Sequence, residues 1–158
     1  MKNMIFFNAE ANSKVGGGHL YRSIALAKEC RNVGLNPGFI FSSSSESFID
    51  KVNKFGFPAY LIEEKKQFEI DSYLDIMPEK SLIVFDTDDY RFYSGKLIDE
   101  FRKNHIKTAC YTITDRYKIT TDILINPNII ARKHTYNTLP STHKLLGPQY
   151  LIFQKEFT

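Results

Sequence analysis

Tryptophan is absent from the 158 residues, and cysteine occurs only as Cys30 and Cys110. Both cysteines lie on apolar periodic segments without the close spacing of metal-binding pairs, so we expect buried free thiols in a reducing compartment and no metal site. No apolar run approaches the roughly 18–20 residues that a membrane span requires. The apolar run at residues 4–7 is too short, and too soon followed by polar residues, for a signal peptide. These absences predict a cytoplasmic protein without a membrane span.

The chain also lacks a strong excess of charge of one sign. It contains 21 basic and 18 acidic residues, which gives a formal net charge of +3. A nucleic-acid-binding protein usually concentrates its basic residues on one stripe, whereas here they alternate with acidic residues. The densest basic clusters, Lys65-Lys66 and Arg132-Lys133, are interpreted as solvated surface. We therefore expect no nucleic-acid partner.

Short hydrophobic runs alternate with segments of helical periodicity along the chain, which is typical of βαβ units. The length falls within the usual range for one domain, and the 13 phenylalanines and nine tyrosines indicate a well-filled aromatic core. The expected strands are residues 4–7, 39–41, 59–62, 82–85, 108–113, 122–125 and 145–146. The expected helices are residues 19–33, a segment from near 46 to before 56, 68–76 and 93–104. The pattern predicts one α/β domain over residues 1–158, with a doubly wound, Rossmann-like parallel sheet.

The glycine stretch Gly16-Gly17-Gly18 stands directly before the first predicted helix and invites a nucleotide-binding interpretation. The dinucleotide fingerprint requires a further glycine three places after the second one, and that place is Tyr21. A phosphate-binding P-loop requires Gly-Lys-Ser/Thr at the helix start, where this chain has His19 and a leucine. Both motifs fail. What remains is a glycine loop that lets the backbone approach a ligand closely.

His19 lies in the first turn of the predicted helix. The positive end of the helix dipole disfavours an imidazolium there, so we expect a lowered pKa for His19. A neutral imidazole at pH 7 can accept a proton from water or a hydroxyl, as a general base must. The alternative is a histidine that merely caps the helix. The sequence leaves both interpretations open.

Polar side chains follow several of the predicted strands. In open α/β sheets the ligand crevice lies outside the carboxyl ends of the strands, so these side chains are expected to converge on one edge. They are His19, Asp86, Asp88, Asp89, Asp115, Asn126 and Asn128. A turn or helix-cap role is favoured for Asp88 and Asp89. Convergence with the glycine loop favours a functional role for Asp86 and Asp115.

The residues GGGHLYR at 16–22, followed by ALA at 25–27, resemble a Gly-x-Gly-His-x-x-Arg…Leu-Ala segment. It belongs to the nucleotide-sugar hydrolases of pseudaminic acid biosynthesis. Spore-coat polysaccharide biosynthesis proteins share this segment, and MurG-type glycosyltransferases are more distant relatives. Three further stretches agree in order and spacing: IVFD at 83–86, DILINPN at 122–128, and LLGPQY at 145–150 with EF at 156–157.

This resemblance implies a nucleotide-sugar hydrolase in surface polysaccharide or nonulosonic acid biosynthesis. The family has a two-domain glycosyltransferase-B architecture, and this chain would be its N-terminal half, sharing the UDP-sugar with a missing C-terminal domain. His19 would be the catalytic base that activates water for attack on the anomeric carbon, with C–O cleavage and release of UDP. No cofactor is expected. The candidate substrate-binding residues are Gly17, Gly18, Arg22, Asp86, Tyr90, Asp115 and Asn128.

The chain departs from the family pattern in three places. An Arg-x-Asp pattern after the first strand is replaced by residues 7–10, an Asp-His-Tyr after the fourth strand by residues 86–90, and a basic residue near the end by Gln149. Two alternatives therefore stay open. One is a glycosyltransferase in which His19 activates an acceptor hydroxyl, and the other is a non-catalytic accessory domain fused to a sialic-type sugar cytidylyltransferase. In either case we expect the chain to continue beyond Thr158, and the isolated chain to fold without turnover.

Overall fold

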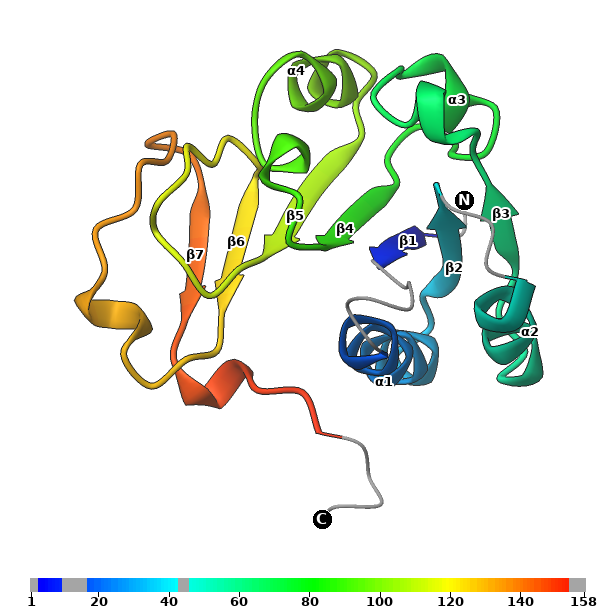
Figure 1. The fold of residues 1–158 in the computed structure, drawn as a ribbon, viewed down its shortest axis with the longest axis horizontal. Helices are drawn as coiled ribbons and strands as arrows, with labels where there is room; N and C mark the ends of the chain where they lie inside the picture. Colours follow the sequence, from blue (N-terminus) through cyan, green and yellow to red (C-terminus); the bar gives the residue numbers. More distant parts are fainter. Residues whose placement is uncertain (1–2, 10–16, 43–45, 154–158) are drawn as a thin grey trace.

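The computed structural model describes residues 3–9, 17–42 and 46–153, and Figure 1 shows their arrangement. Within these ranges seven strands form one sheet in the order β3-β2-β1-β4-β5-β6-β7. Every neighbouring pair is parallel. The strands are β1 (Met4–Ala9), β2 (Asn36–Phe41), β3 (Ala59–Leu61), β4 (Leu82–Asp86), β5 (Lys107–Tyr111), β6 (Ile123–Asn126) and β7 (His143–Leu146).

Helices cover both faces of this sheet. In Figure 1, α1 (Gly18–Asn32) and α2 (Glu46–Lys54) lie below it, whereas α3 (Asp71–Leu74) and α4 (Lys96–Lys103) lie above it. The chain moves from β1 outward to β3, returns to β4 beside β1, and then proceeds to the opposite edge. This is a doubly wound, Rossmann-like α/β fold, as the sequence predicted. The direction of winding reverses between β1 and β4.

Two hydrophobic cores fill the spaces between sheet and helices. Successive side chains of a strand point to opposite faces of the sheet. Phe6 therefore joins the core between the sheet and α4, and Phe7 joins the core between the sheet and α1. Both rings are fully buried. Phe101 from α4 packs in the first core and Leu20 from α1 in the second. The positions of both helices, and so of the residues at the start of α1, are fixed by packing against the sheet.

The predicted helices differ from the observed ones where local geometry interrupts them. The helix expected over residues 93–104 begins only at Lys96, because Gly95 has a φ of 90° and separates it from the 3₁₀ turn Tyr90–Phe92. The helix expected over residues 68–76 is reduced to the single turn Asp71–Leu74. The strand expected to reach residue 113 ends at Tyr111. The first helix is found at Gly18–Asn32, followed by Gly34 with a φ of 88°.

Several further expectations concern single residues. Cys30 and Cys110 are buried free thiols, as predicted, and burial raises the pKa of Cys110 to about 12. In the described ranges no helix has the length and apolar character needed to cross a membrane. Residues 10–16 and the pair Glu156-Phe157, which contribute to the family resemblance and its departures, lie outside the described residues.

Candidate active site

The candidate site lies where the winding of the sheet reverses. In open α/β sheets a crevice forms at this position, outside the carboxyl ends of the two strands concerned. Asp86 is the last residue of β4 and is paired in register with Ala9, the last residue of β1. His19 lies in the first turn of α1, the helix that follows β1. The topology therefore brings His19 and Asp86 to the same edge of the sheet.

The His19 ring is held by Asp86 through one of its two nitrogens. Nδ1 lies 3.0 Å from the Asp86 backbone oxygen and 3.1 Å from its Oδ1. Both of these oxygens are acceptors, so Nδ1 carries a proton and donates it to them. Nε2 lies 3.9 Å from Oδ2 of Asp88. In its neutral form His19 thus presents the lone pair of Nε2. No side chain forms a capping hydrogen bond at the start of α1, so the role of His19 is not helix capping.

Asp86 is a buried carboxylate, with 2% of its side chain exposed. Its oxygens accept hydrogen bonds from Arg22 (Nε at 2.9 Å, and the second guanidinium nitrogen to the other oxygen), from Ser23 Oγ at 3.2 Å, and from His19. Burial opposes the ionisation of Asp86, but the hydrogen bonds from His19 and Arg22 outweigh it and hold its pKa below the ordinary value. The carboxylate is therefore ionised at neutral pH.

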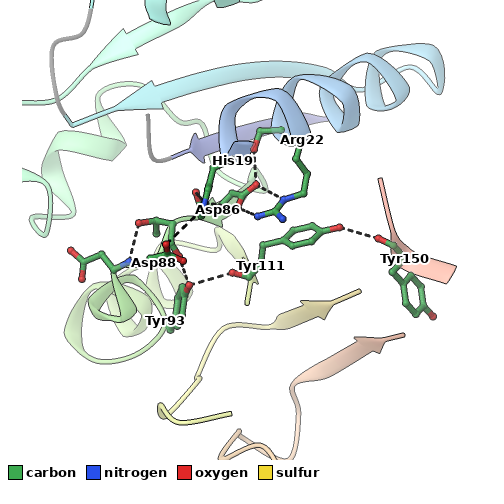
Figure 2. A network of polar contacts seen from close by, with 10 residues as sticks. His19, Arg22, Asp86, Asp88, Tyr93, Tyr111 and Tyr150 are labelled. Atoms are coloured by element: carbon green, nitrogen blue, oxygen red, sulfur yellow. Dashed lines mark hydrogen bonds and ion pairs between the residues drawn. The ribbon is translucent and has the colours of Figure 1, made fainter. Parts of the chain in front are cut away.

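Arg22 lies between this carboxylate and an aromatic ring (Figure 2). Its guanidinium carbon is 4.3 Å from the centre of the Tyr111 ring, a cation–π arrangement. The Tyr111 hydroxyl donates to the backbone oxygen of Tyr150 at 2.9 Å. The Tyr93 hydroxyl contacts the backbone oxygens of Thr87 and Tyr111. Tyr111, the last residue of β5, thus packs against Arg22, and it is held in turn by Tyr150 in the turn after β7.

The predicted direction of the His19 pKa shift is wrong. The pKa of His19 is raised, because its hydrogen bond and charge interaction with Asp86 outweigh burial and the repulsion by Arg22, both of which lower it. The helix N-terminus is a partial charge, whereas Asp86 is a full charge in direct contact. A proton-accepting His19 therefore becomes more populated as pH rises through this raised pKa.

A cleft of about 560 Å³ adjoins the cluster. It is lined by Asp88, Tyr93, residues 112–117 and His134, so it extends over the carboxyl ends of β4 and β5. Asp88 belongs both to this lining and to the surroundings of His19 Nε2. Asp88 therefore connects the cleft to His19, which is not itself a lining residue.

Of the other acidic candidates, Asp88 and Asp115 line the cleft and Asp89 does not. Asp89 accepts a hydrogen bond from the backbone N–H of Arg91, which confirms the turn role favoured for it. The turn interpretation did not foresee that Asp88 faces His19. Asp115 lines the cleft but is paired with His134, with Nδ1 and Oδ2 3.0 Å apart, rather than with His19.

Four other candidates have roles that can be described from their contacts. Tyr90 stacks on Tyr117, a residue of the cleft wall, with ring centres 4.4 Å apart. Asn128 is occupied in a turn, where its side-chain oxygen accepts from the N–H of Ile130 at 3.1 Å. A Cβ at Gly17 would lie 2.9 Å from the Tyr21 ring, whereas one at Gly18 would meet no protein atom within 4 Å.

The sequence interpretation did not identify Ser23, Tyr93, Tyr111, Arg116 or His134 as site residues. A signal existed for Ser23, because residues three and four apart on a helix share a face, and Ser23 is four places after His19. For the tyrosines and His134 no local pattern distinguishes them from core or turn residues. Their place in the site depends on strand order, which brings distant segments together.

A comparison with solved structures supports this fold. No family model matches the chain. The chain is 25% identical over 158 positions to an uncharacterized protein of Methanocaldococcus jannaschii, covering 94% of this chain and 30% of that protein. The crystal structure of Acinetobacter baumannii MurG superposes with a TM-score of 0.55 at 12% identity, covering 92% of this chain and 45% of MurG. The chain thus spans less than half the length of either protein, and its Rossmann-like fold resembles the part of MurG on which it superposes.

Proposed function

We propose that this chain carries the general base of an enzyme that acts on a nucleotide sugar, and that the base is His19. The observation that supports this most is the arrangement of His19 and Asp86 at the switch point of the sheet. Asp86 holds Nδ1, which leaves Nε2 beside the cleft with its lone pair available. The same arrangement of a carboxylate behind a histidine fixes the tautomer and stabilises the imidazolium that forms during proton transfer.

In the proposed hydrolysis, Nε2 accepts a proton from a water molecule as its oxygen attacks the anomeric carbon of the sugar. The bond between that carbon and the diphosphate oxygen breaks, and UDP leaves with the bonding electron pair. His19 then holds the proton, and the resulting positive charge is balanced by Asp86 at 3.1 Å. The imidazolium returns to the neutral base by releasing the proton to the solvent. Arg22 stays bound to Asp86 throughout and keeps the carboxylate in place.

The nucleotide is proposed to be held mainly by a second domain. The described residues contain neither of the two glycine-rich phosphate motifs tested in the sequence, and the chain covers 45% of the MurG chain that it superposes on. A single lobe would provide one wall of the substrate cleft and would not exclude water from His19. Catalysis is therefore attributed to the longer protein.

Glycosyl transfer is the second candidate, and the cleft favours it. A volume of about 560 Å³ beside Asp88 exceeds what one attacking water needs and is within the range of small-molecule sites. His19 would then take its proton from an acceptor hydroxyl instead of water. UDP release that rises with an added acceptor supports transfer, and release that no acceptor changes supports hydrolysis.

The test of His19 is replacement by asparagine in the full-length protein, with UDP release measured on the UDP-sugar that the unaltered protein turns over fastest. Loss of a general base is expected to lower kcat by about 10²–10⁴-fold. The unaltered enzyme should also become faster as pH rises through the raised pKa of His19. His105→Asn is the matched control, because His105 is exposed and has a φ of 56° that asparagine readily adopts. Normal turnover by His19→Asn would refute the assignment.

A further inference from the structure

The cleft contains a second pair of histidine and carboxylate that the proposed catalysis does not use. His134 Nδ1 lies 3.0 Å from Asp115 Oδ2, and a quarter of the histidine side chain is exposed. As with His19, Nδ1 is bonded to the carboxylate, so Nε2 is the nitrogen that can contact a ligand. Both residues line the cleft. The hydrogen bond and charge of His134 also lower the pKa of Asp115, which keeps this carboxylate ionised.

Arg116 lines the same cleft and differs from the other arginines of the chain. Arg22, Arg31, Arg91, Arg102 and Arg132 each donate a side-chain hydrogen bond to a carboxylate or a backbone oxygen. For Arg116, the structure gives only a bond from its backbone N–H to Thr114 Oγ1 at 3.2 Å. Among the described residues its guanidinium has no acceptor. It is an exposed cation at the wall of a cleft, with its full set of donors available.

Strand order separates the charges of the cleft. Asp88 follows β4 and lies near His19, Arg116 follows β5, and His134 follows β6. These strands are successive neighbours in the sheet, and adjacent strands are about 4.8 Å apart, so the ends of β4 and β6 are roughly 10 Å apart. The cleft accordingly has Asp88 at the end beside His19, and Arg116 with the pair of His134 and Asp115 at the other end.

We propose that Arg116 and His134 bind a phosphate group of the molecule that occupies this cleft. A guanidinium binds two phosphate oxygens in a fork, and a tetrahedral phosphate still presents another oxygen, to which the protonated form of the imidazole can donate from Nε2. A carboxylate has only two oxygens, which the guanidinium alone would satisfy. Asp115 is already bonded to Nδ1 of His134, which leaves Nε2 for the phosphate. Resting on the proposed function, the site is an anchor separate from the leaving group, because Arg116 and His134 follow β5 and β6, whereas His19 and Asp86 lie at the ends of β1 and β4.

The proposal is tested by titrating the full-length protein with inorganic phosphate at constant ionic strength, using the NMR signals of the His134 ring and of backbone amides 112–117. We expect saturable shifts with a dissociation constant in the millimolar range, typical of a single anion (about −4 kcal/mol at 1 mM). Arg116→Gln should weaken binding by at least about fivefold. Lys118→Gln is the matched control, because it removes the same charge from an exposed residue of the same loop that does not line the cleft. It should change binding by less than about twofold.

His134→Gln should weaken phosphate binding as Arg116→Gln does, and acetate should bind several-fold more weakly than phosphate. The proposal is overturned if phosphate produces no saturable shift, if Lys118→Gln has the same effect as Arg116→Gln, or if acetate binds as well as phosphate. None of these measurements needs turnover. Phosphate binding without any UDP release would count against the proposed function alone, and turnover without phosphate binding would count against this site alone.

Discussion

Replacing Arg22 by methionine tests the charge balance of the cluster. Methionine keeps an unbranched stem against the Tyr111 ring but removes both guanidinium bonds to Asp86 and the cation–π contact at 4.3 Å. Asp86 is 2% exposed, so its carboxylate cannot turn to solvent. Removal of one partner of a buried ion pair costs about 3–5 kcal/mol. His19 and Ser23 remain as donors, so we expect the lower part of this range, about 3 kcal/mol of lost unfolding free energy at pH 8.

The loss should be smaller in mild acid because His19 can replace the missing charge. Arg22 lowers the pKa of His19, so its removal raises that pKa further above the unfolded value of 6.5. A group with a raised folded pKa contributes stability that is full below its unfolded pKa and is lost as pH rises through its folded pKa. Protonated His19 therefore compensates Asp86 at pH 5.5 and does so progressively less towards pH 8. At pH 5.5 we expect a loss of about 1–2 kcal/mol.

Urea unfolding of the unaltered protein and of Arg22→Met at pH 5.5 and pH 8 measures both quantities, and NMR titration of the His19 ring reports the pKa change directly. Arg91→Met is a suitable control, because Arg91 pairs with Asp89 on the surface and its loss should have a small effect that is independent of pH. A loss below about 0.5 kcal/mol at pH 8, or an equal loss at both pH values, would refute the reasoning.

Two further predictions concern the glycine loop and the isolated chain. Gly17→Ala should lower the free energy of unfolding by about 1–2 kcal/mol, measured by thermal unfolding, because its Cβ would lie 2.9 Å from the Tyr21 ring. Gly18→Ala should keep or slightly raise this free energy. The opposite order of the two variants would contradict the packing argument. Residues 1–158 alone should fold and bind UDP with a dissociation constant weaker than about 1 μM in calorimetric titration, since one lobe provides half a cleft. Tighter binding would place a nucleotide site in this lobe.

The fold could be predicted because its signals are local and repeated. Short apolar runs such as residues 82–85 stand between segments of helical period, and strands buried on both faces have few other interpretations. The lengths of the helices were harder to predict from the sequence. Tyr93 has the apolar character of a helical residue, yet it precedes the Gly95 break and is buried, with its hydroxyl on the backbone oxygens of Thr87 and Tyr111. Tertiary packing decides such a position, and the periodicity of the segment does not report it.

The site could be predicted only in part. The rule that ligands bind at the carboxyl ends of strands was sufficient to bring His19 and Asp86 together, although 67 residues separate them in the chain. It could not give the sign of the His19 pKa shift, because that depends on which atom of Asp86 contacts the ring. Asp115 was correctly placed at the same edge, but its partner His134 follows a different strand and no sequence pattern links the two.

The contrast between the two histidine–aspartate pairs explains why we assign them different roles. A buried carboxylate beside a histidine favours the imidazolium, which cannot accept a proton. At Asp86 the guanidinium of Arg22 supplies a permanent positive charge, so the carboxylate does not depend on a protonated His19, and Arg22 in turn lowers the pKa of His19. Asp115 accepts no hydrogen bond from an arginine among the described residues, and its bonded partner is His134, which balances the carboxylate charge only when it is protonated. The first pair can therefore cycle as a base, whereas the second is suited to hold a charge that an anionic ligand would share.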